Sequence, residues 1–122
     1  MTLDWLDFDA SEDTDEGVTF DAMASVWPDQ LSLVLTEAAA VLAWARQAFG
    51  LERPLDEGGA WDVDLQAWRE TQPARSLSID LHNARLLADD LDPEGERVRH
   101  TVTLSLSGGA PFAEAFRRQF NL

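Results

Sequence analysis

The clearest hydrophobic pattern in the chain runs from Pro28 to Gly50. Pro28 suits the first turn of a helix, where its missing N–H would have no partner, and Gly50 suits the position just past the end. Between them, apolar residues recur every three or four positions, as on the buried face of an amphipathic helix. They are Leu31, Val34, Leu35, Ala38, Val41, Leu42, Ala45, Ala48 and Phe49. The pattern predicts a long core helix.

Two shorter stretches also have helical spacing. Phe20, Met23, Ala24 and Trp27 predict a short helix over residues 20–27, ending before a proline. Near the end of the chain, Pro111 opens a second predicted helix, in which three phenylalanines at intervals of four form one row. They are Phe112, Phe116 and Phe120.

After residue 60 the period changes from helix to strand. Apolar and polar residues alternate over 61–68, over 77–82 and over 98–106. His100 falls in phase with the apolar positions of its strand, so we expect it to be at least partly buried. Short connections between successive strands predict an antiparallel meander.

These elements predict a single domain over residues 1–122 with an α+β fold in two layers. We expect N-terminal helices packed on a three-stranded antiparallel meander, followed by a C-terminal helix. The acidic N-terminal segment, 1–19, has three possible interpretations: an edge strand, a short helix, or a partly flexible segment that orders on a partner. A calcium loop is excluded there, because with Glu12 as the first ligand the twelfth position is Met23.

Charge narrows the choice of function. The chain has 23 acidic and 9 basic residues, a formal net charge of −14, and no cysteine. Such acidity disfavours direct binding to nucleic acid or to an anionic membrane, and favours encounter with basic proteins. Met1 is followed by Thr2, Leu3 and Asp4, which predicts no secretory signal, and we expect a cytoplasmic protein.

Candidate chemistry is sparse. Asp80 and His82 are two residues apart on one side of a predicted strand, where they could form a hydrolytic or metal-binding patch. The plainer interpretation is a half-exposed polar sheet face stabilised by cross-strand charge pairs, with Arg97 or Arg99 lying opposite. We therefore expect no catalytic site, no cofactor and no metal.

The tryptophans are more informative. Trp68 is out of phase with Trp61 in its strand, so we expect it on the polar sheet face unless a bulge shifts the phase or the N-terminal segment folds over it. Trp44 and Leu33 lie beside the main stripe of the long helix, so something must cover that flank. The two candidates for this cover are the N-terminal segment and a second molecule.

Aromatic side chains rimmed by carboxylates suit a basic protein partner, because the aromatics anchor it and the charges steer it. The predicted function is thus that of a small bacterial non-enzymatic binding module, such as an immunity protein that blocks a toxin. The alternatives are a dimeric chaperone for a secreted effector and a small enzyme that uses Asp80 and His82. The expected partner-binding residues are Asp62, Asp64, Trp68, Asp80, His82, Asp89, Asp90, Asp92, Glu94 and Glu96.

Overall fold

The computed structural model describes residues 2–12, 17–70, 75–76, 79–86 and 99–122. In chain order, its elements are β1 (Asp9–Glu12), β2 (Val18–Val26), α1 (Pro28–Phe49), a 3-10 turn (Leu55–Glu57), β3 (Trp61–Arg69), β4 (Arg75–Ser76), β5 (Ile79–Asp80), β6 (Arg85–Leu86), β7 (His100–Gly108) and α2 (Ala110–Phe120).

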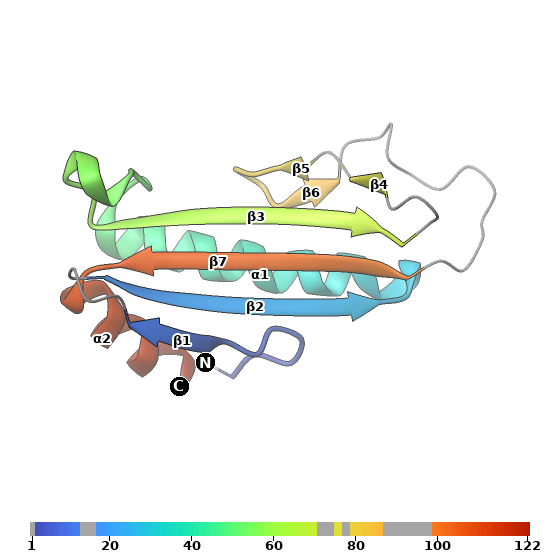
Figure 1. The fold of residues 1–122 in the computed structure, drawn as a ribbon. Coiled ribbons are helices and arrows are strands. Elements are labelled where there is room, and N and C mark those ends of the chain that lie inside the picture. The colour runs from blue at the N-terminus through green and yellow to red at the C-terminus, as the bar shows by residue number, and fades with distance from the viewer. Residues whose placement is uncertain (1, 13–16, 71–74, 77–78, 87–98) are drawn as a thin grey trace.

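Five of the strands form one antiparallel sheet in the order β1-β2-β7-β3-β4. Strand β7, near the end of the chain, lies between β2 and β3 (Figure 1). Both helices lie on one side of this sheet, as Figure 1 shows. The α+β class, the antiparallel sheet and the predicted long and C-terminal helices are thereby confirmed.

The predicted helix over 20–27 is wrong, because these residues belong to β2. Phe20 and Ala22 are buried while Asp21 and Met23 are exposed, and this alternation continues to Val26. Phe20, Met23, Ala24 and Trp27 fit helical spacing by coincidence. Among the described residues, α1 is therefore the only α-helix before β3, and two strands precede it.

The predicted meander is also wrong. Its middle strand was expected over 77–82, but the described part of this range, Ile79–Asp80, pairs with Arg85–Leu86 in a separate two-stranded sheet. Strand β7 pairs directly with β3 on one side and with β2 on the other. The second neighbour of β7 is thus β2, a strand from the N-terminal part of the chain.

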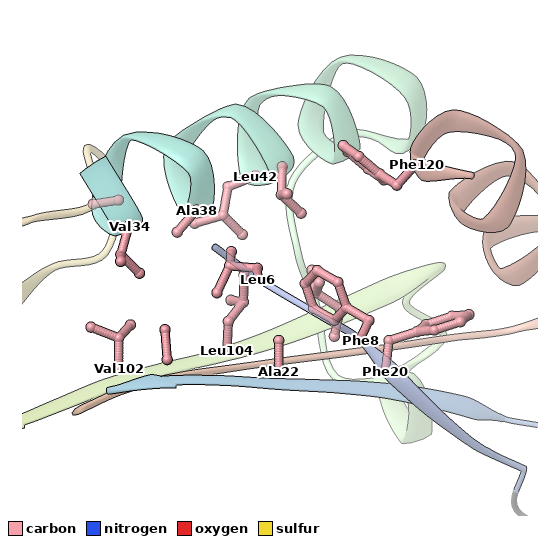
Figure 2. Close-up of a cluster of buried hydrophobic side chains, with 14 of the residues drawn as sticks. Leu6, Phe8, Phe20, Ala22, Val34, Ala38, Leu42, Val102, Leu104 and Phe120 are labelled. Carbon is pink, nitrogen blue, oxygen red and sulfur yellow. The ribbon is translucent and has the colours of Figure 1, made fainter. Parts of the chain in front are cut away.

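The core lies between the sheet and α1. In Figure 2, Val34, Ala38 and Leu42 of the helix point toward Val102 and Leu104 of β7. All five are fully buried, which matches the predicted helix stripe and the predicted phase of β7. His100 is buried as well, in agreement with its phase in the strand.

A second part of the core joins α2 to the rest. The phenylalanine row of α2 is buried, and Phe112 stacks on the Trp61 ring with centroids 5.8 Å apart. Trp44 of α1 lies 5.3 Å from Phe120 and 6.0 Å from Phe116, measured between ring centroids. The C-terminal helix therefore packs on the Trp44 flank of α1, a cover that differs from both predicted candidates. Leu33 stays half exposed.

Candidate functional site

One face of the main sheet has no described helix on it. Along β2, β3 and β7, the residues facing that side alternate with more buried ones, whereas all four residues of β1 are exposed. We call this surface the open face, and define it by the outward residues of β1, β2, β7 and β3. They are Asp9, Ser11, Thr19, Asp21, Met23, Ser25, Thr101, Thr103, Ser105, Ser107, Asp62, Asp64, Gln66 and Trp68.

The strand register brings aspartates into one row across the open face. Asp9 lies opposite Asp21, Asp21 opposite Ser105, and Ser105 opposite Asp64. The Ser105 hydroxyl donates a hydrogen bond to the Asp21 carboxylate. With strands about 4.8 Å apart, Asp21 and Asp64 are roughly 10 Å apart. Asp62 lies one position further along, in a row with Ser107.

A hollow of about 450 Å³ opens at the β1 side of this row. Asp7, Asp9 and Asp21 line it together with the hydroxyl-bearing residues Thr103 and Ser105, and with Ala22 and Met23. Met23 is 67% exposed, which places an apolar side chain among the carboxylates. Within the described residues, no group of three metal-ligating side chains is arranged to hold a metal ion.

The other end of the open face has its charges balanced. Glu70 accepts hydrogen bonds from the hydroxyls of Thr101 (2.6 Å) and Ser25 (3.1 Å), and these bonds lower the pKa of its carboxyl group. Arg99 donates to the hydroxyl and the carbonyl oxygen of Ser25, and its guanidinium lies 5.0 Å from the centre of the Trp27 ring. Among the described residues, the open-face aspartates Asp9, Asp21, Asp62 and Asp64 all lie toward the opposite end.

Three of the predicted binding residues lie on the open face. Asp62 accepts a hydrogen bond from the Val63 N–H (2.9 Å), and Asp64 accepts one from the side-chain amide of Gln66 (2.8 Å). Trp68 lies opposite Thr101 in an unbroken register, so no bulge shifts its phase. These positions follow the predicted phase of β3.

Asp80 and His82 belong to the separate β5–β6 hairpin. The Asp80 carboxylate accepts hydrogen bonds from the Asn83 side chain (2.7 Å) and from the His82 N–H (3.0 Å), which lower the pKa of Asp80. The His82 carbonyl oxygen accepts a hydrogen bond from Arg46 (3.0 Å). Both residues therefore make contacts that shape and anchor the hairpin. The predicted position of Arg99 across from these residues is wrong, because Asp80 pairs with Arg85 in the hairpin and Arg99 bonds to Ser25.

The remaining predicted residues lie outside the described part of the chain. They are Asp89, Asp90, Asp92, Glu94 and Glu96, and Arg97 lies there too.

The sequence pattern did not indicate that four residues would meet around the hollow. They are Asp7, Asp9, Asp21 and Met23. Their signal was the alternation of Phe20, Ala22, Ala24 and Val26 with polar residues, which the helical interpretation of this stretch concealed.

No family model matches the chain, and neither a curated protein nor a solved structure is significantly similar to it. Within the described residues, no helix combines the length and the apolar character needed to cross a membrane.

Proposed function

We propose that this chain is a non-enzymatic binding module that blocks a basic surface of a partner protein with the open face of its sheet. An immunity protein that neutralises a basic toxin is a concrete case. The carboxylates would occupy cationic side chains of the partner, and the exposed Met23 would supply an apolar contact among them.

The observation that carries this proposal is the placement of Asp9 directly opposite Asp21. Like charges opposite each other on neighbouring strands destabilise a sheet. Solubility alone does not require this arrangement, because carboxylates spread over the surface achieve it at lower cost. Destabilising features of this kind are typical of functional sites, where binding compensates for them.

The other two candidate functions receive less support. The chaperone hypothesis relied on an apolar flank at Trp44 and Leu33, and α2 packs against Trp44. The enzyme hypothesis relied on Asp80 and His82, whose described contacts hold a turn together.

The proposal is tested with a triple variant, Asp7→Asn, Asp9→Asn and Asp64→Asn. Asp9 and Asp64 lie on the open face, and Asp7 lines the hollow beside it. Asp21 is kept because it accepts the Ser105 hydrogen bond. The matched control removes three exposed charges elsewhere, Asp56→Asn, Glu57→Gln and Glu114→Gln, so both proteins reach the same net charge. A fluorescein-labelled hexa-arginine peptide serves as the probe, and its binding is followed by fluorescence anisotropy at low and high salt.

We expect the open-face variant to bind at least about tenfold more weakly than the control, a difference of about 1.4 kcal/mol. We also expect it to be more stable than the control, because the Asp9–Asp21 repulsion is relieved by roughly 0.2–1 kcal/mol. Equal losses of affinity in both variants would mean that only total charge matters, and the proposal would be wrong.

A further inference from the structure

Glu37 of α1 binds the N-terminal segment through an unusual set of contacts. Its carboxylate accepts hydrogen bonds from three consecutive backbone N–H groups, those of Asp4 (2.8 Å), Trp5 (3.0 Å) and Leu6 (2.7 Å). Hydrogen bonds to an ionised acceptor are stronger than neutral ones, and a row of backbone N–H groups forms a natural site for an anion. One side chain of the helix thus fixes the course of the chain just before Asp7.

The residues that follow alternate between the core and the open face. Leu6 and Phe8 are buried, and Figure 2 shows both side chains in the core between sheet and helix. Asp7 and Asp9 are exposed and line the hollow. The position of these two carboxylates therefore depends on how the segment is held on either side of them.

The β1–β2 ladder ends at the hollow. Its last pair is Asp9 with Asp21, so a longer β1 would have placed Asp7 opposite Met23. The Glu70 N–H bonds to the Arg99 carbonyl oxygen, and the Gly109 N–H to the Ala60 carbonyl oxygen. These two bonds fix which residues of β3 and β7 point their backbone groups toward each other.

Along a strand, the backbone N–H and C=O groups of successive residues point to opposite sides. The residues of β7 that do not bond to β3 therefore point toward β2, and the register of this pair decides which residues of β2 point toward the N-terminal segment. It directs the N–H and C=O groups of Met23 toward the N-terminal segment. Among the described residues, no backbone hydrogen bond joins Asp7 to Met23. The hollow lies between them instead.

We propose that Glu37 is a positioning residue for the open face. By binding the N–H groups of Asp4, Trp5 and Leu6, it draws the segment away from β2. The ladder then stops at Asp9, the hollow stays open, and Asp7 and Asp9 stand beside Asp21. This inference rests on the proposed function of the open face, although its structural part can be tested separately.

The test compares Glu37→Gln, which removes the charge, with Glu37→Asp, which keeps the charge on a side chain one methylene shorter. Glu114→Gln controls for the loss of one charge, and Val41→Ala controls for a general loss of stability in α1. Each full-length protein is titrated with the fluorescein-labelled hexa-arginine peptide. Amide signals and hydrogen exchange are measured by NMR in the absence of the peptide.

We expect Glu37→Gln to weaken peptide binding by about fivefold or more, while both controls stay within about twofold of the wild type. Glu37→Asp should lie between Glu37→Gln and the wild type. The amides of Asp4, Trp5 and Leu6 should exchange faster in Glu37→Gln, and the amide signals of Asp7 and Met23 should shift. Such local changes separate positioning from a general loss of stability, which Val41→Ala reports.

The two ideas can fail independently. If the wild type does not bind the peptide, the proposed function is wrong, and the NMR measurements alone decide the role of Glu37. If the wild type binds but Glu37→Gln binds equally well, with unchanged signals for Asp7 and Met23, the positioning role is overturned. Should Glu37→Gln not fold, the same comparison between Glu37→Asp and Val41→Ala decides.

Discussion

The packing is tight at Gly108, the last residue of β7, where the strand meets the buried ring of Phe112. A Cβ atom at this position would lie 2.4 Å from Cδ1 of Phe112 and 2.7 Å from its Cβ. The Phe112 ring is buried and stacks nearly parallel on Trp61, at an interplanar angle of 2°. Trp61 is also buried, and its indole N–H donates to the Gly50 carbonyl oxygen at 2.9 Å. Neither ring has room to yield.

We therefore expect Gly108→Ala to destabilise the protein, because α2 must shift away from the sheet to admit the methyl group. Inserting an extra carbon into a well-packed core typically costs about 1–3 kcal/mol. The short distances to both the ring and the Cβ of Phe112 place this case at the upper end, at about 2–3 kcal/mol. For a domain of this size, that corresponds to a decrease in Tm of roughly 4 °C per kcal/mol.

Urea unfolding followed by tryptophan fluorescence measures this effect, because Trp61 and Trp44 both contact Phe112. Gly17→Ala is the matched control. Among the described residues, its Cβ would meet Cδ1 of Leu55 at 3.7 Å and the Gly108 carbonyl oxygen at 3.9 Å, which are ordinary contacts. A Gly108→Ala protein within about 0.5 kcal/mol of the control would refute the packing argument.

Two further predictions concern residues outside the open face. Glu52 accepts two hydrogen bonds from Arg46, which hold its pKa below the ordinary value of 4.5. This pair should stabilise the fold fully above about pH 4.5 and progressively less as the pH falls further. The stability difference between the wild type and Glu52→Gln, about 1 kcal/mol at neutral pH, should therefore shrink in acid, as urea titrations at several pH values will measure. Leu33 is half exposed, so we expect Leu33→Asp to change the free energy of unfolding by no more than about 0.5 kcal/mol. The elution volume in size-exclusion chromatography should also stay the same. A wild-type dimer that Leu33→Asp dissociates would instead favour the chaperone hypothesis.

The parts of the fold that the sequence predicted share one property. The helix α1 and the strands β3 and β7 carry their own period over many residues, and the neighbouring chain does not change it. The helix prediction for residues 20–27 was wrong because Ala22 and Ala24 are small and weakly apolar, so the strand alternation they support is faint. The larger residues Phe20 and Trp27 then dominated the pattern and indicated a helix.

The same reasoning explains which site residues could be predicted. Asp62 and Asp64 follow from the phase of one strand, and the sequence places them on the polar face. Their relation to Asp21 depends on β7 entering between β2 and β3, and the Asp21–Ser105 hydrogen bond spans 84 residues. No local pattern encodes such a pairing, because register between distant strands is set by how their apolar faces fit the same core.

The net charge of −14 would by itself explain little, since solubility accounts for it. Its distribution is more informative. Arg46 binds Glu52, Arg99 stacks on Trp27, and Arg117 lies 3.8 Å from Glu12, so three cations are committed away from the acidic row. The row itself keeps two aspartates in direct opposition, at a cost in stability that another residue at either position would avoid. None of the outward positions of β1, β2, β3 and β7 carries an arginine, so the open face keeps its negative charge.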